Sequence, residues 1–183
     1  GDGVFNQEDK VVISNSSRRY YGGFQNSISY KGLQLDFLLE FVGQRGNSVL
    51  NGPFGVPGFG PNGGYGGNQP SIIQNRWKGP QDPGSDIQRY SQSFTALVPY
   101  YNMRSSDAAL TNTSFARLKN ISLNYRFSNA ILDRIHLEDC TFFVNAQNIF
   151  TWTGYNGFDP QFPSSLQNIP SLRVIGGGVK LKF

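Results

Sequence analysis

Apolar residues recur at every second position in several stretches of the chain. The clearest stretch places Leu33, Leu35, Phe37, Leu39 and Phe41 on one parity. The positions between them include Gln34, Asp36 and Glu40. Alternation with a period of two is typical of a β-strand that has one apolar and one polar face. The pattern predicts five long strands, near residues 19–31, 33–45, 114–128, 137–151 and 171–183.

A two-residue turn joins the first two predicted strands. Only Lys31 and Gly32 separate them, which is the spacing of a tight β-hairpin. Such a turn places Tyr30 opposite Leu33 on the same face. The apolar stripes of the two strands then coincide, so we expect a hairpin in this register.

The connections between the predicted strands alternate between short and long. Residues 31–32 and 128–136 are short connections, and we expect one turn of helix at Ala130–Arg134. Residues 46–113 and 152–170 are long, and the first is rich in glycine and proline, which predicts irregular loops with short local helices and no spanning strand. Short turns on one side and long loops on the other are typical of outer-membrane barrels.

The sequence therefore predicts an all-β fold, an antiparallel transmembrane β-barrel segment with long extracellular loops. The alternative is a soluble antiparallel sandwich, which also alternates apolar and polar residues. A sandwich does not predict the regular alternation of loop lengths, and its strands are usually about five or six residues long. The smallest single-chain membrane barrels need about eight strands. We therefore expect the chain to be a segment of a longer protein or one chain of a composite barrel.

Composition and charge exclude several classes of function. Charged residues make up 15% and aromatic residues 14% of the chain, with 22 glycines, a balance that suits β-structure with loops. The net charge of +4 is scattered, and Arg18-Arg19 is the only adjacent basic pair, so we expect no nucleic-acid binding. Cys140 and His136 are each the only residue of their type, which excludes a disulfide framework and two-histidine metal motifs. No residues resemble a nucleophile with its base, so we expect no enzyme.

The first residues of the chain resemble the second half of a calcium-binding loop. Asp2, Asn6 and Asp9 would supply oxygen ligands, and Gly3 would supply the sharp turn that such a loop needs. The first two ligands would precede Gly1, so calcium is expected only in a full-length protein. The alternative is a solvated acidic turn. The segment is neither basic nor followed by an apolar run, so it does not predict a signal peptide.

Trp77, Trp152 and Tyr155 are the candidate substrate-binding residues, because they fall in predicted extracellular loops. An aromatic ring there can stack on a sugar, or it can belong to the aromatic belt that flanks a bilayer. The polar parity of the strands is expected to line the barrel lumen, where it would contact a plug or line a polar channel. These positions are Gln34, Asp36, Glu40, Asn124, Arg126, Asn145 and Gln147.

Three blocks of sequence resemble the SusC/RagA-type TonB-dependent outer-membrane transporters of Bacteroidetes. Residues 20–32, which read YYGGFQNSISYKG, are similar to that family's hairpin. Residues 114–125, SFARLKNISLNY, are similar to its "S-x-RLKN" strand. Residues 145–160, NAQNIFTWTGYNGFDP, are similar to its "GQNLFTWT-Y-G-DP" signature, and Phe183 matches its terminal aromatic residue. These blocks cover about half the chain in the family's order.

The resemblance implies an importer of oligosaccharide or peptide in the bacterial outer membrane. The family has a 22-stranded barrel with an N-terminal plug, is energised by TonB and is capped by a SusD-like surface lipoprotein. Residues 1–183 would be the C-terminal part of the barrel, its last five strands, without plug domain or TonB box. Outer-membrane lipid and the rest of the barrel would be the other partners, with calcium as the one cofactor to consider.

By resemblance to outer-membrane proteins in general, the last strand would also carry the barrel-assembly signal. Val179, Leu181 and Phe183 share one face of that strand and would form the signal. The rival function is a soluble β-sandwich carbohydrate-binding module, in which Trp77, Trp152 and Tyr155 would form a sugar-binding platform.

Overall fold

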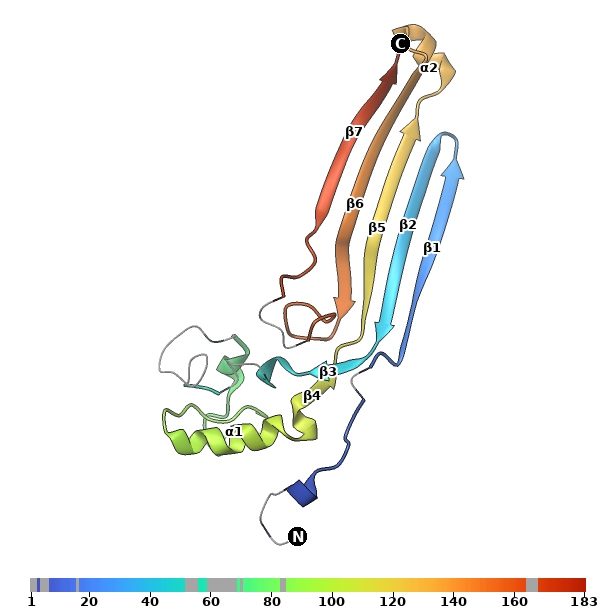
Figure 1. Cartoon of the computed structure of the whole chain (residues 1–183). Helices are drawn as coiled ribbons and strands as arrows, with labels where there is room; N and C mark the ends of the chain where they lie inside the picture. The colour runs from blue at the N-terminus through green and yellow to red at the C-terminus, as the bar shows by residue number, and fades with distance from the viewer. Residues whose placement is uncertain are drawn as a thin grey trace.

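The main feature of the computed structural model is one five-stranded antiparallel sheet in the order β1-β2-β5-β6-β7 (Figure 1). The structure describes residues 3, 7–15, 17–51, 56–58, 69, 71–82, 85–163 and 168–183. The strands of the sheet are β1 Tyr20–Tyr30, β2 Leu33–Gly43, β5 Phe115–Arg126, β6 Asp139–Thr153 and β7 Val174–Lys182. The shortest has 9 residues and the longest 15. A β-strand that crosses a bilayer needs about 9–11 residues, so each strand is long enough to do so.

The five predicted strands are confirmed, and so is their antiparallel pairing. The largest difference in a boundary is at β7, which begins at Val174 rather than at residue 171. The predicted helical turn between the third and fourth strands is α2, Asn129–Ile135. Among the described residues, no helix combines the length and the apolarity that a membrane span requires.

The hairpin at Lys31-Gly32 forms as predicted. Tyr30 pairs with Leu33, and the two turn residues have φ angles of 45° and 84°. Two successive positive φ angles define a type I′ turn, whose twist matches that of the flanking strands. A Cβ atom on Gly32 would lie 2.5 Å from the backbone oxygen of Arg126 in the neighbouring strand. The turn therefore requires glycine both for its backbone conformation and for this close approach.

The connections separate to opposite ends of the sheet. The Lys31-Gly32 turn and α2 lie at one end, which we call the turn end, and the long connections lie at the other, the loop end (Figure 1). The described residues between β2 and β5 form short elements. They are β3 Arg45–Asn47, β4 Leu110–Asn112, α1 Leu97–Arg104 and the 3-10 turns Val49–Asn51, Ser71–Asn75, Phe94–Ala96 and Asp107–Ala109.

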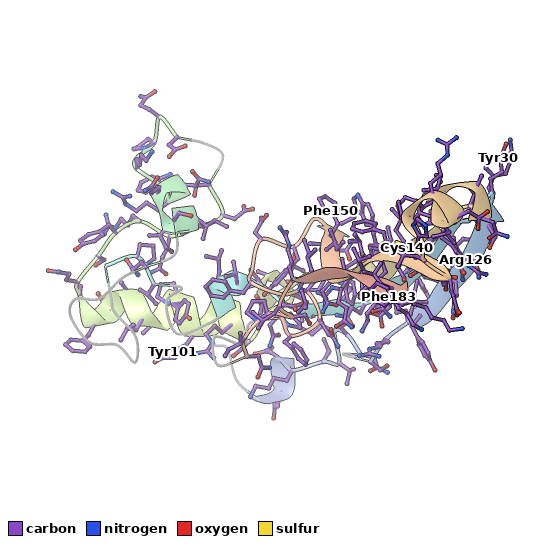
Figure 2. The ribbon with its side chains drawn as sticks, turned by 90° about the horizontal axis from the view of Figure 1, so that it is seen from above. Tyr30, Tyr101, Arg126, Cys140, Phe150 and Phe183 are labelled. Atoms are coloured by element: carbon purple, nitrogen blue, oxygen red, sulfur yellow. The ribbon has the colours of Figure 1, made fainter. Side chains whose placement is uncertain are left out.

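This segment has a small core of its own beside the sheet. Val56 and Tyr100 are buried there, with Leu97 and Met103 packed against them. The helix α1, which carries Tyr101, lies to one side of the strands in the view from above (Figure 2). β3 pairs with β4 as a separate two-stranded sheet. The prediction of a long loop with local helices and no spanning strand is therefore confirmed for the described residues.

The sheet leaves large apolar side chains exposed on one face. Register pairs such as Ile28 with Leu35 and Leu35 with Leu123 place these residues side by side across the strands. The exposed members of this face are Tyr20, Phe24, Ile28, Tyr30, Leu33, Phe41, Leu123, Phe142, Phe150, Trp152, Ile175, Val179 and Leu181. We call it the apolar face. The opposite, polar face carries Gln34, Asp36, Glu40, Asn120, Ser122, Asn124, Asn145 and Gln147.

Candidate functional site

Arg117 is the centre of a buried network of polar side chains at the loop end of the polar face. Its Nη2 atom lies 2.7 Å from Oδ1 of Asp159, and both side chains are 4% exposed. Its Nε donates to Oγ1 of Thr151 at 2.9 Å, and its Nη1 donates to Gln161 and Ser171, each at 3.2 Å. These five residues form the Arg117 network, which ties β5 and β6 to the connection between β6 and β7.

Asp159 also organises the backbone of that connection. Its Oδ1 accepts a hydrogen bond from the Gln161 N–H at 2.9 Å, and its Oδ2 accepts one from the Ser171 N–H at 3.4 Å. A buried carboxylate is stabilised only when its oxygens are paired or hydrogen-bonded. Arg117 and the two backbone N–H groups meet this requirement. The connection is thereby held against the polar face.

A second buried contact joins the end of β2 to the same connection. Gln44 is 9% exposed, and its Nε2 donates to the backbone oxygen of Pro160 at 2.8 Å. The Ser114 hydroxyl accepts from the Gln44 backbone N–H at 3.1 Å. The Asp159-Pro160 pair is therefore held from two strands at once, by Arg117 and by Gln44.

A β-bulge in β5 places Arg117 on the polar face. Leu38 pairs with Asn120, but the next residue of β2, Leu39, pairs with Leu118. Lys119 is therefore an extra residue, and the parity of β5 changes across it. Without the bulge Arg117 would share the face of Ile121. With it, Arg117 pairs with Glu40 and lies on the polar face.

The neighbouring strand is irregular at the same level. Leu118 pairs with Phe150 and Asn120 with Gln147, so residues 148–149 of β6 stand opposite Lys119 alone. Asn148 has a φ of 52°, the left-handed conformation that asparagine tolerates better than most residues. Lys119 itself forms an ion pair with Glu40 at 3.3 Å. The irregularity thus crosses two adjacent strands, next to the Arg117 network on the side of the turn end.

A shallow hollow of about 460 Å³ lies on the sheet, between the bulge and the turn end. Its polar lining consists of Gln25, Asp36, Asn120, Ser122, Asn145 and Gln147. The carboxylate of Asp36 accepts from Gln34 Nε2 at 3.0 Å. Carboxamides both donate and accept hydrogen bonds, so this surface suits hydroxyl or amide groups. Three residues predicted to face the lumen, Asp36, Asn145 and Gln147, line this hollow, and Gln34 adjoins it through Asp36.

The three candidate substrate-binding aromatic residues lie in three different surroundings. Trp152 is 51% exposed on the apolar face, where its ring lies 4.6 Å from that of Phe150. An exposed ring on this face is what the aromatic-belt alternative predicts. Tyr155 is 8% exposed, so its ring is a packing element of the loop. Trp77 lines a separate hollow of about 360 Å³ with Tyr100 and other residues. Substrate contact by Trp152, Tyr155 or Trp77 stays a prediction.

Two other predicted sites also remain predictions. Asp2 and Asn6 lie outside the described residues, and Asp9 ends the 3-10 turn Gln7–Asp9. In the part of the chain that the structure describes, no three His, Cys, Asp or Glu residues gather as a metal site. Val179, Leu181 and Phe183 are 56%, 47% and 84% exposed at the turn end, where an assembly factor can reach them.

The Arg117 network was not predicted from the sequence. Alternation counted back from Ile121 gives Arg117 and Lys119 the parity of the apolar face, where charged residues are disfavoured. These two basic residues on the apolar parity are the signal in the sequence that could have indicated a bulge at Lys119. Asp159 belongs to a loop, and its partner 42 residues away could not be derived from a local pattern.

Comparisons with known proteins agree with this fold. No protein-family model matches the chain. It is 26% identical over 197 residues to TonB-dependent receptor P3 of Formosa agariphila, an alignment that covers 100% of the chain and 18% of that receptor. It is 28% identical over 162 residues to TonB-dependent receptor P26 of the same organism, covering 88% of the chain and 15% of the receptor. The chain thus spans less than a fifth of these relatives.

Solved structures show the same arrangement. The chain is similar to the RagAB peptide importer in its closed-closed state, with a TM-score of 0.67, 24% identity and coverage of 94% of the chain and 18% of the neighbour. The open-open state gives a TM-score of 0.59 and 25% identity over 89% of the chain and 17% of the neighbour. The all-β antiparallel fold, the family motifs and the named relatives agree. The chain is therefore similar to one segment of TonB-dependent receptors and of the RagAB peptide importer, in agreement with the resemblance to SusC/RagA-type transporters.

Proposed function

We propose that the chain forms part of the wall of an outer-membrane importer that takes up oligosaccharide or peptide. The observation that carries the proposal is the two-sided sheet. Its strands are long enough to cross a bilayer, one face exposes large apolar residues, and the other carries amides and hydroxyls. Lipid on the first face and an aqueous lumen on the second would satisfy both surfaces.

The exposed area of the chain favours a segment of a barrel wall rather than a compact soluble domain. The chain exposes 12894 Å². A compact soluble protein of the same mass, 20.3 kDa, would expose about 8800 Å² by the usual scaling with mass. A sheet that is open on both faces contributes to this excess. Further polypeptide and membrane lipid would cover it.

The partners follow from the same proposal. The two edge strands, β1 and β7, would pair with the rest of a 22-stranded barrel, because unpaired backbone groups are costly in lipid. A SusD-like surface lipoprotein would meet the loop end, and TonB would supply energy through a part of the protein outside this chain. RagAB is described as a peptide importer, which supports peptide as one substrate class. The role proposed for this segment is structural and selective, and it includes no catalytic step.

The carbohydrate-binding module is less well supported. A β-sandwich buries one face of each sheet against the other. Within the described residues, no second sheet packs on the five-stranded one. The apolar face is exposed instead, with Ile175 at 71% and Val179 at 56%. Trp77 and Trp152 also lie on different parts of the molecule, so they do not form a shared platform.

Deletion of the full-length gene tests the proposal. Cells with and without the gene would be supplied in turn with neutral oligosaccharides, acidic oligosaccharides and peptides as the nutrient. We expect cells without the gene to take up at least one of these classes more slowly, and the wild-type gene to restore this uptake. We also expect the protein in the outer-membrane fraction of cells that carry the gene. Unchanged uptake of all classes, or a protein that fractionates as soluble, would contradict it.

A further inference from the structure

Three arginines gather at the loop end of the sheet, where β1 begins and β2 ends. Arg18 and Arg19 directly precede β1, and Arg45 is the first residue of β3. Two hollows meet at this point and share Gln44 and Arg45 in their linings. One, of about 460 Å³, reaches Arg18, and the other, of about 360 Å³, reaches Arg19. Arg45 therefore faces both hollows, with one basic neighbour in each.

Backbone contacts fix this arrangement. The Arg19 N–H donates to the Gly43 oxygen at 2.9 Å, which holds the basic pair against the end of β2. Arg45 is paired with Asn112 across the short β3-β4 ladder. A turn precedes the pair, in which the Ser17 N–H donates to Oδ1 of Asn15 at 2.9 Å. The positions of the arginines thus follow from the ends of the strands.

None of these arginines has an acidic partner among the described residues. Arg117, Lys119, Arg126 and Lys182, by contrast, each form an ion pair with an acidic side chain. Neither hollow has an aspartate or glutamate in its described lining. The other polar side chains of the two linings are hydroxyls and amides. They are Ser14, Ser17, Gln44, Asn47, Asn112, Ser114 and Gln161.

From these observations we infer that the paired hollows around Arg18, Arg19 and Arg45 bind an oxyanion, either a carboxylate or a phosphate. The guanidinium group is a planar fork of donors that matches both groups in a bidentate manner. Hydroxyl and amide donors in the lining complete the coordination of an anion. An anion between the hollows also relieves the repulsion of like charges that no residue of the described lining neutralises.

This inference rests on the proposed function in one respect, because that function places the loop end outside the cell. The anionic group then arrives from the external medium or from the outer leaflet of the membrane. In the first case it belongs to a free acidic solute, and the site selects acidic ligands at the mouth of the importer. In the second it is the phosphate of a membrane glycolipid. The chemistry recognised is the same.

Inorganic phosphate is the first probe. The full-length protein in neutral detergent would be titrated with it by calorimetry, beside a variant that carries Arg18→Gln, Arg19→Gln and Arg45→Gln. The matched control carries Arg76→Gln, Lys78→Gln and Arg89→Gln, which remove the same charge from the segment between β2 and β5. We expect the first variant to bind phosphate about tenfold more weakly or worse, since charge-assisted hydrogen bonds are lost. The control should stay within about twofold of the wild type.

Two further measurements distinguish the sources of the anion. An acidic oligosaccharide that competes with phosphate on the wild type, and not on the Arg18/Arg19/Arg45 variant, identifies a free solute. Lipid-linked phosphate that co-purifies with the wild type and is depleted from the variant identifies a glycolipid. Equal phosphate affinity of the wild type and both variants, or no binding by any of them, overturns the inference. Outer-membrane fractionation of all three proteins shows separately whether the proposed location holds.

Discussion

Arg117 of β5 and Asp159 of the β6-β7 connection form a buried ion pair, with Nη2 and Oδ1 2.7 Å apart. The two residues belong to separate family motifs, the "S-x-RLKN" strand and the "DP" signature. Their contact joins the two blocks in the folded chain. The strand supplies the cation, and the signature supplies the carboxylate that folds the connection onto the polar face. Gln44, which binds the Pro160 oxygen at 2.8 Å, supports the same connection.

Removing one partner of this pair should release the connection. Arg117→Ala leaves the Asp159 carboxylate buried without its cation, which typically costs about 3–5 kcal/mol. We expect faster amide hydrogen exchange and faster proteolysis across residues 154–163 of the full-length protein. Arg126→Ala is the control, because its ion pair with Asp139 is exposed, with side chains 65% and 31% accessible. Exposed pairs contribute about 0–1 kcal/mol. Equal protection of 154–163 in both variants would show that the pair does not hold the connection.

Deletion of Lys119 should be far more harmful than its substitution. Without the extra residue, the part of β5 before it reverses its parity, and Arg117 moves to the apolar face. A charged residue on a lipid-facing surface costs about 2–4 kcal/mol near the midplane and less toward the interface, and the Arg117 network is lost as well. Lys119→Gln keeps the bulge and loses only the half-exposed ion pair with Glu40. Heat-modifiable migration in detergent gels would report folding. A deletion variant that folds as well as Lys119→Gln would refute this role of the bulge.

The Lys31-Gly32 turn makes a third, local prediction. Gly32→Ala introduces a Cβ at φ 84°, 2.5 Å from the Arg126 oxygen, and should destabilise the hairpin by more than about 1 kcal/mol. Lys31→Asn should be neutral or stabilising, since Asn-Gly is the preferred pair of a type I′ turn. Urea unfolding from lipid vesicles measures both changes. A tolerated Gly32→Ala would mean that the turn relaxes away from β5.

Position in the sheet should decide the effect of an added charge. Arg at Leu35, Phe37 or Leu123 should cost about 2–4 kcal/mol, if these sites lie near the midplane. Arg at Gln34 or Ser122, one residue away on the polar face, should cost little. The difference in unfolding free energy between the two sets is the quantity to measure. Similar costs on both faces would argue against a membrane wall.

Local patterns predicted the strands and the first turn because both depend on neighbouring residues. The alternation around Leu35 and the turn residues Lys31 and Gly32 contain this information directly. Phe143 is an aromatic residue on the polar face of β6, where its ring lies over Gly178 of β7, in a gap that a Cβ there would fill. Only the pairing of β6 with β7 brings these two residues together, and no local pattern predicts it.

The candidate sites were harder to predict because they depend on contacts distant in sequence. The bulge at Lys119 places Arg117 on the polar face, whereas a strict period of two along β5 assigns it to the apolar face. Gln44 and Pro160 are 116 residues apart, so no local pattern brings them together. Trp152 and Tyr155 were both predicted to lie in an extracellular loop. The structure places one on the apolar face and buries the other.

The central claim is that one face of the sheet meets lipid and the other meets water. Spin labels on the full-length protein in vesicles measure this directly. The labels are attached to single introduced cysteines, in a variant in which Cys140 is replaced by alanine and any other native cysteines are also replaced. Labels at Leu35, Phe37 and Leu123 should collide more often with oxygen, which concentrates in lipid. Labels at Gln34, Asp36 and Ser122 should collide more often with a water-soluble nickel complex. Alternation of the two accessibilities along β2 is the predicted result. Equal water accessibility at both sets of positions would contradict the account.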